Sequence, residues 1–195
     1  MILQLSTTTP WNTNYCTEEG QIIYKVTSGA PSIGPRLMKI SRIVAPELGS
    51  SETLDDWAFR DVFKPLAEVA YNAILSSRIK YGEKDESVSK FFRQGDWGFY
   101  GRSKVFTGPD GKEYAWSLTA RVPKLHVNGT NTPIAIFHRH RMGIIDDARP
   151  ASLEIFAAGE HMVDLILVTF VYIEKLRRAR ERAAARNPWA GGGGL

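Results

Sequence analysis

The sequence predicts a mainly β, antiparallel fold: a closed or nearly closed barrel built around one buried C-terminal helix. Turn signals recur at short intervals between β-rich segments up to residue 156, as in a barrel or a sandwich. From residue 161 to about 185 the chain contains no Gly or Pro, and apolar residues cover every side of the first part of the expected helix. A helix that is apolar all round is buried all round, so the strands before it must curl around it.

The strands are expected where β-branched and aromatic residues run between turn residues. Pro109 and Gly111 mark one hairpin turn, because proline presets one turn dihedral and glycine permits a positive φ. Asn128-Gly129 marks a second hairpin, and a short helix is expected over residues 87–93. The expected strand segments are 2–5, 21–27, 36–44, 66–75, 78–81, 103–107, 113–119, 124–127, 133–139 and 153–156.

The expected C-terminal helix is rich in β-branched residues, which form isolated helices poorly, so packing must stabilise it. Its apolar run, 163–173, includes Asp164 and is shorter than the roughly 20 apolar residues of a membrane span, which indicates a buried helix. Glu160 and Asp164 stand at the positive end of the helix dipole, and arginines stand at the negative end. The pattern becomes polar after Leu176, so we expect the helix to leave the core there.

One domain is expected over residues 1–186, with an acidic insertion at about 45–64 and a flexible, Gly-rich tail at 187–195. Hydrophobic residues make up 43% of the chain and charged residues 24%, a balance that excludes wholesale disorder. Cys16 is the single cysteine, so no intrachain disulfide is possible. The first residues show no signal-peptide pattern, and we expect an intracellular, cytoplasmic protein that can associate peripherally with membranes.

The formal net charge of +4 is concentrated at the end of the expected helix, where six basic and two acidic residues lie between 174 and 186. A nucleic-acid binder usually spreads its basic residues over a folded face, so nucleic acid is not an expected partner. The segment is a candidate membrane contact, at about 1 kcal/mol for each Lys or Arg near an anionic lipid surface. A solvated helix end with local ion pairs, such as Glu174–Arg178, is an equally open alternative. The six basic residues are Lys175, Arg177, Arg178, Arg180, Arg182 and Arg186.

A second set of basic residues is a candidate phosphate site, because guanidinium groups offer bidentate donors to phosphate. Alternation along one strand would place two of these arginines on one face of the sheet. The alternative is an ordinary solvated wall of the sheet, and we prefer it because exposed arginine is common. The candidate residues are Arg121, Lys124, Arg139, Arg141 and Arg149.

Three further features each have two interpretations. His138 and His140 alternate and could begin a metal site, but a stable site usually needs three or four ligands, and we prefer a plain polar strand face. Asp164 is either a functional acid with a raised pKa or, as we prefer, a residue of the first helical turn that accepts backbone N–H bonds. An aromatic set is either a ligand-facing patch or, for most of its members, core or hairpin packing. Its members are Trp97, Phe99, Tyr100, Trp116 and Trp189.

Several motifs occur together in a characteristic order. Asp96-Trp97 precedes the first hairpin, and the segments 136–139, 149–155 and 159–164 lead in turn to the helix. The set resembles a family of fungal domains of unknown function, best known from mushroom-forming fungi, over most of the chain. That family is in turn similar to the tubby, phospholipid-scramblase and LURP-one superfamily. The resemblance implies a barrel of about twelve strands around a C-terminal helix, and some tubby-like members bind phosphoinositide headgroups. It carries no catalytic motif onto this chain.

No catalytic constellation stands out in the sequence, which lacks a Gly-rich phosphate loop and a nucleophile elbow. We therefore expect a non-catalytic binding module rather than an enzyme, with no cofactor and no metal. Anionic phospholipid or phosphoinositide at a membrane surface is the leading ligand. A structural scaffold that binds a protein partner is one alternative, and an unrecognised enzyme is another.

Overall fold

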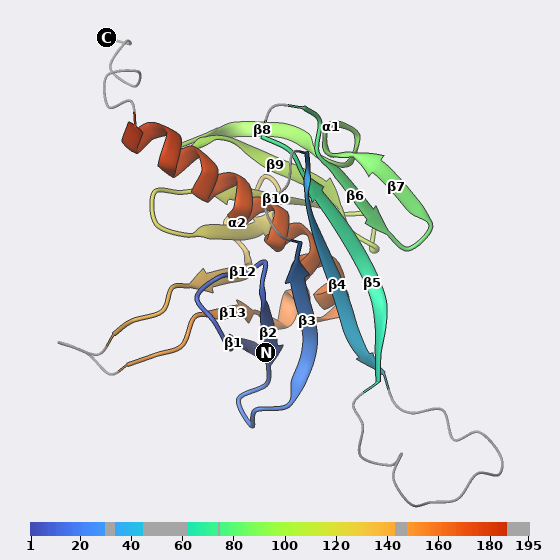
Figure 1. Ribbon diagram of the computed structural model, residues 1–195. Helices are drawn as coiled ribbons and strands as arrows, with labels where there is room; N and C mark the ends of the chain where they lie inside the picture. Colours follow the sequence, from blue (N-terminus) through green and yellow to red (C-terminus); the bar gives the residue numbers. More distant parts are fainter. Residues whose placement is uncertain (30–33, 45–61, 74, 143–147, 187–195) are drawn as a thin grey trace, which may run out of the picture.

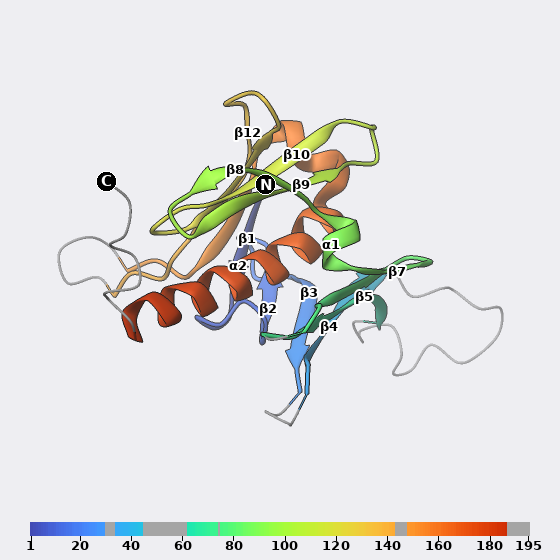
Figure 2. The ribbon, with the colours of Figure 1, turned by 90° about the horizontal axis from the view of Figure 1, so that it is seen from above.

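The computed structural model describes residues 1–29, 34–44, 62–73, 75–142 and 148–186, which form one antiparallel sheet of 13 strands and one long helix. Figures 1 and 2 show the sheet curved around this helix, α2 (Val163–Arg186), whose last turns project from one end. A 3-10 helix, η1 (Ala157–Met162), leads into α2. The strands are β1 (Ile2–Leu5), β2 (Thr13–Cys16), β3 (Ile22–Ser28), β4 (Arg36–Val44), β5 (Val62–Tyr71), β6 (Arg78–Tyr81), β7 (Lys84–Ser87), β8 (Arg93–Gly98), β9 (Gly101–Thr107), β10 (Glu113–Leu118), β11 (Pro123–Val127), β12 (Pro133–His138) and β13 (Ser152–Ile155).

The sheet is ordered β7-β6-β5-β4-β3-β2-β1-β13-β12-β11-β10-β9-β8, so its two edges are strands that follow one another in the chain. The short helix α1 (Val88–Phe91) joins these edges, and no ladder of hydrogen bonds connects them within the described ranges. The mainly β, antiparallel prediction is confirmed, but a closed barrel is not. Side chains fill this seam instead: the Phe92 ring stacks on Tyr172 of α2 at 5.6 Å and meets Phe106 of β9 edge-on at 6.0 Å.

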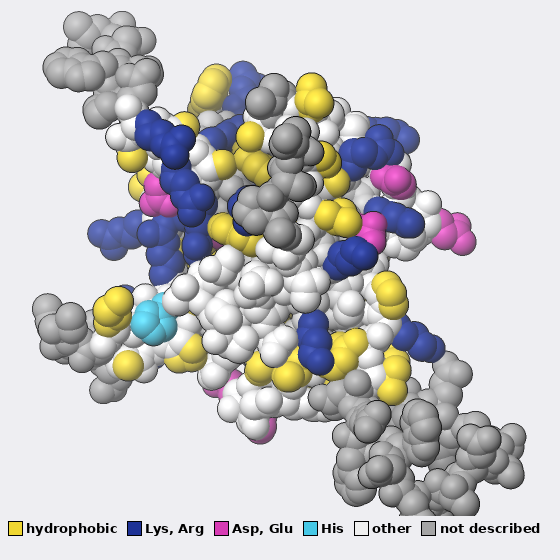
Figure 3. All heavy atoms as spheres, viewed as in Figure 1, with side chains coloured by type: hydrophobic (Ala, Val, Ile, Leu, Met, Phe, Trp, Pro, Cys, Tyr) yellow, Lys and Arg dark blue, Asp and Glu magenta, His cyan; other side chains and the backbone are white. Residues whose placement is uncertain are grey.

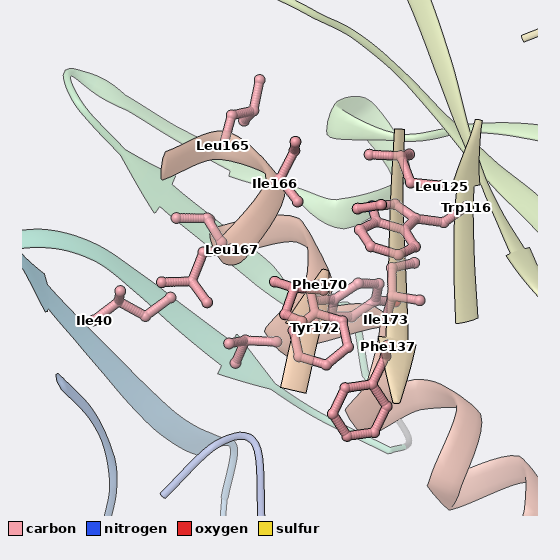
Figure 4. Close-up of a cluster of buried hydrophobic side chains, with 14 of the residues drawn as sticks. Ile40, Trp116, Leu125, Phe137, Leu165, Ile166, Leu167, Phe170, Tyr172 and Ile173 are labelled. Atoms are coloured by element: carbon pink, nitrogen blue, oxygen red, sulfur yellow. The ribbon is translucent and has the colours of Figure 1, made fainter. Parts of the chain in front are cut away.

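The core lies between the sheet and the first half of α2. Every residue from Ile166 to Ile173 is at most 5% exposed, which confirms that this part of the helix is buried. Trp116 Nε1 donates to Thr169 Oγ1 (3.0 Å), and that hydroxyl donates to the Leu165 carbonyl (2.8 Å), so these buried polar groups are satisfied. Figure 4 shows the aromatic and aliphatic side chains of α2 packed against those of the strands.

The helix remains in the core beyond Leu176, so the expected exit at that residue is wrong. Arg177 and Glu174 are both 0% exposed. The Glu174 carboxylate accepts hydrogen bonds from Arg177 Nε and from Arg178 Nε, each at 2.7 Å. Because a paired charge can be buried where an isolated one cannot, a segment that is polar in sequence continues inside the protein.

Three strands were not predicted: β2, β7 and β8. Two of them, KDES and RQGDWG, are mostly polar and lack a hydrophobic alternation, so pairing with their neighbours decides their conformation. The strand expected at 66–75 runs instead from Val62 to Tyr71, so residues 62–64 pair with β4 and do not belong to the acidic insertion. The remaining insertion, 45–61, and the tail, 187–195, lie outside the described residues.

Candidate functional site

The end of the molecule at which α2 projects brings together loops from distant parts of the chain (Figure 1). Loop 6–12, the turn between β8 and β9 and the segment after β12 each contact α2 between residues 175 and 181, and the end of β5 lies beside Lys175. We call the surface formed by these loops and α2 from Lys175 onward the exit end. Its polar contacts are Arg178 Nη2 to the Thr8 carbonyl (3.1 Å), Arg180 Nη1 to the Tyr100 carbonyl, and Arg139 Nη2 to Glu181 Oε1 (3.3 Å).

Four large apolar side chains stand out from the exit end. Met142 is 81% exposed, Trp97 77%, Phe99 73% and Leu75 72%, whereas no other large apolar side chain in the described part of the chain exceeds 44%. They belong to the β8–β9 hairpin, the segment after β12 and the loop after β5. Apolar groups exposed in this way mark sites of interaction with a protein or a membrane.

The predicted aromatic patch divides between core and surface. Trp116 is fully buried against α2, so its interpretation as core is correct. Tyr100 is half-buried, with the Arg177 guanidinium 5.9 Å from its ring centre. Trp97 and Phe99 form the exposed part of the set, and Trp189 lies outside the described residues.

Three of the five predicted phosphate-binding residues, Arg139, Arg141 and Arg149, lie in the segments between β12 and β13, whereas Arg121 and Lys124 lie at the β10–β11 connection, and no described cavity gathers the five. Each of the five is exposed, and each lies in a loop or near the end of a strand. Arg141 and Arg149 pair through their backbones (3.0 and 3.2 Å), and Arg139 contacts Glu181 of α2. The five residues are Arg121, Lys124, Arg139, Arg141 and Arg149.

The basic segment of α2 is only partly available to a partner. Figure 3 shows Lys and Arg side chains gathered along the projecting part of α2. Arg182 and Arg186 are exposed, whereas Arg178 and Arg180 are half-buried and hold the loops described above. The Lys175 ammonium lies 4.1 Å from the centre of the Trp11 ring. Arg177 is fully buried, so its predicted membrane contact is wrong.

A cleft of about 640 Å³ lies between the β8–β9 hairpin and α2, and we call it the exit cleft. Trp97 and Arg102 line one side, with the guanidinium 5.1 Å from the ring centre, and Arg180 lines the other. Gly101 makes the approach of Arg180 possible, because its φ is +96° and a Cβ there would lie 2.5 Å from Arg180 Nη1. Gln94 and Tyr100 complete the lining.

A bulge in β8 determines which residues face the exit cleft. Gln94 pairs with Lys104 and Trp97 with Arg102, with an irregularity between the two pairs, so two residues three apart in β8 oppose two residues that alternate on β9. Lys104 is only 7% exposed, and its ammonium group makes no hydrogen bond or ion pair with any described residue. Burial, and to a lesser extent the positive charge of Arg180, lower the pKa of Lys104.

Sequence reasoning missed Arg102 and Lys104 as functional candidates. A signal was present, because both alternate with Phe106 and an alternation of period two places all three on one face of a strand. Phe106 is buried in the core, so that face is the inner one.

A larger cavity, of about 1010 Å³, lies at the opposite end of the molecule and contains Asp164. Tyr24 donates its hydroxyl proton to Asp164 Oδ1 (2.5 Å), and Arg42 Nη1 donates to Oδ2 (2.7 Å). Burial and the hydrogen bond to Asp164 raise the pKa of Tyr24. Asp164 lies in the first turn of α2, as predicted, but its partners are side chains rather than backbone N–H groups. It therefore ties α2 to β3 and β4.

The two alternating histidines do not form a shared site. His138 Nε2 lies 2.7 Å from Glu154 Oε2 on the neighbouring strand. His140 lies beyond the end of β12, and the ranges described above hold no group of three or more His, Cys, Asp or Glu side chains placed for a metal ion.

Comparison with known proteins identifies a family but not a function. A family model described as a family of unknown function (DUF6593) matches residues 8–179, and the chain belongs to that family. No curated protein and no solved structure matches the chain. None of the helices in the described ranges is long and apolar enough to span a membrane.

Proposed function

We propose that this chain is a non-catalytic binding module that docks on anionic phospholipid membranes through its exit end. One observation supports the proposal above all: the four most exposed large apolar side chains of the described residues lie in the β8–β9 hairpin, the segment after β12 and the loop after β5, around the cationic end of α2. Proteins that lie on a membrane combine apolar insertion with attraction to anionic lipids in this way. The resemblance to the tubby, phospholipid-scramblase and LURP-one superfamily, in which some tubby-like members bind phosphoinositide headgroups, supports the same proposal.

Each part of the exit end has a physical role in this docking. Trp97 and Phe99 enter the interface, where an indole ring is favoured because it is both apolar and able to hydrogen-bond. Arg182 and Arg186 remain at the level of the headgroups and contribute about 1 kcal/mol each near an anionic surface. The loops need no rearrangement, since their side chains already project from the folded molecule.

The charge distribution supports the same orientation. Segment 45–61 contains five acidic residues and one basic residue. It joins the described structure at Val44 and Val62, which pair with each other at the end of the molecule away from the exit end. Docking through the exit end keeps this acidic segment's attachment point away from an anionic membrane, where repulsion would oppose binding.

Vesicle cosedimentation tests the proposal. The intact chain is expected to bind vesicles that contain both phosphatidylcholine and phosphatidylserine at low salt and to dissociate from them at high salt. It is not expected to bind vesicles of pure phosphatidylcholine. The double variant Trp97→Ala/Phe99→Ala is expected to lose at least tenfold in affinity by the roughly 25 cal/mol per Å² of apolar area that it withholds from the interface.

The matched control is Val62→Ala, which shortens an exposed apolar side chain at the opposite end and is expected to bind as the intact chain does. Absence of binding at low salt would refute the proposal and leave the exit end as a surface for a protein partner. Equal affinity of the double variant and the control would show that these loops do not meet the membrane.

A further inference from the structure

We propose that the exit cleft is a binding site for a phosphate monoester, whose dianionic group lies among Arg102, Lys104 and Arg180. This proposal rests on the proposed function in one respect: if the exit end docks on a membrane, the cleft determines which class of lipid headgroup it selects. The recognising groups themselves belong to the cleft and to the residues directly behind it.

The charge around the cleft is not balanced by the protein. Six cations lie near two carboxylates, which pair with only three of them. Glu174 accepts hydrogen bonds from Arg177 and Arg178, and Glu181 accepts them from Arg177 and Arg139. In the described structure neither carboxylate pairs with Arg102, Lys104 or Arg180, and the Arg180 guanidinium donates to the Tyr100 carbonyl alone. The six cations are Arg102, Lys104, Arg139, Arg177, Arg178 and Arg180.

Two buried donors near the cleft lack acceptors. The first is the ammonium of Lys104, a residue that is 7% exposed, lies on the face of β9 that carries Arg102, opposite Gln94, and pairs with no described carboxylate. The second is Arg177 Nη1, which finds no hydrogen-bond acceptor among the described residues and belongs to the guanidinium 5.9 Å from the centre of the Tyr100 ring. Buried lysine is almost always paired, and an unpaired buried charge is costly. Both residues stand behind the lining of the exit cleft, so an anion bound there supplies an acceptor for the Lys104 ammonium and a counter-charge for the buried Arg177.

The donor set fits a phosphate monoester better than a carboxylate. A guanidinium group can donate bidentate hydrogen bonds to two phosphate oxygens, and an ammonium group adds a compact positive charge. Two guanidinium groups and one ammonium group therefore suit a tetrahedral dianion. The cleft, at about 640 Å³, holds more than the phosphate group, so the esterified part has room beside the Gln94 amide and the Trp97 ring. A lipid headgroup and a soluble phosphate ester both present this group.

The first arm of the test uses glycerol 3-phosphate, measured by calorimetry at constant ionic strength. The intact chain is expected to bind it, and Lys104→Met is expected to weaken binding by roughly tenfold or more, the effect of one lost charged hydrogen bond. Methionine is close to lysine in side-chain length but carries no charge. Because the substitution removes an unpaired buried charge, the melting temperature of Lys104→Met is expected to rise. Arg102→Gln provides a second variant at an exposed position, and Lys80→Met, on the outer face of β6, is the matched control.

The second arm compares vesicles that contain phosphatidic acid, a phosphate monoester, with vesicles of equal surface charge that contain phosphatidylserine. A preference for phosphatidic acid that disappears in Lys104→Met identifies the lipid headgroup as the ligand. Binding of glycerol 3-phosphate without a preference between the vesicles identifies a soluble ester. If glycerol 3-phosphate does not bind and the vesicles are not distinguished, the cleft is no phosphate site. That result leaves membrane docking intact wherever Trp97→Ala/Phe99→Ala still weakens vesicle binding.

Discussion

The buried ion pairs of α2 give the sharpest prediction about stability. Glu174→Gln keeps the size and hydrogen-bonding atoms of the side chain but removes its charge, which leaves Arg177, 0% exposed, with Glu181 alone and deprives Arg178 of its carboxylate partner. Breaking a buried pair by removing one partner costs about 3–5 kcal/mol. For a chain of this length, that cost lowers the melting temperature by roughly 6–20 °C.

The comparison that isolates the effect of burial is Glu86→Gln. Glu86 pairs with Lys90 at 2.9 Å with a spacing of four residues, but Lys90 is 73% exposed in its side chain. Glu86 lies at the end of β7 and Lys90 in α1, and ion pairs exposed in this way contribute about 0.2–1 kcal/mol. Urea unfolding followed by circular dichroism measures both variants under one condition.

A double variant distinguishes an uncompensated charge from a general loss of packing. Glu174→Leu/Arg177→Met removes both buried charges, so it is expected to recover most of the stability lost in Glu174→Gln. The reasoning fails if Glu174→Gln and Glu86→Gln lose similar free energies of unfolding, or if the double variant is less stable than Glu174→Gln.

Two other predictions concern the exit end. A chain that ends at Glu181 is expected to keep its melting temperature within a few degrees, since Arg182 and Arg186 are exposed. The loss of these two cations is expected to weaken binding to anionic vesicles roughly thirtyfold. An unchanged affinity in cosedimentation would remove both residues from the docking surface. Burial, reinforced by Arg36, Arg182 and Arg178, lowers the pKa of Lys175 to about 8. The unfolded chain then binds more protons than the folded chain between pH 8 and about 10.4, so stability from this residue rises with pH across that window. Urea titrations at several pH values should show the wild-type chain gaining stability relative to Lys175→Met; a constant difference would contradict the lowered pKa.

Much of the fold could be predicted because its signals are local. The turn at Pro109 and Gly111 lies between β9 and β10, where the local residues placed it, and the apolar run after Val163 is enclosed as predicted. Strand β8 shows the limit of this reasoning. Its sequence, RQGDWG, has neither alternation nor β-branched residues, and pairing with β9 makes it a strand.

The candidate site was predictable in composition but not in position. The exposed cations of the loops were identified individually, yet the exit cleft is lined by Arg102 and Arg180 from elements about 80 residues apart. The bulge in β8 shifts Trp97 onto the face that looks into the cleft, and a simple alternation from Gln94 would have placed it on the other face. An irregular register depends on the partner strand, and no local pattern reveals it.

The sequence by itself determined that one apolar helix would be enclosed by an antiparallel sheet, because an all-round apolar surface allows no other arrangement in water. Only the tertiary structure decided where that helix leaves the core and which charges are neutralised. Glu174 allows Arg177 to be buried, whereas the buried Lys104 pairs with no carboxylate of the described residues. The cost of burying a charge depends on partners that are close in space but can lie anywhere in the sequence. Buried cations therefore stabilise the core at Arg177 and form part of a candidate ligand site at Lys104.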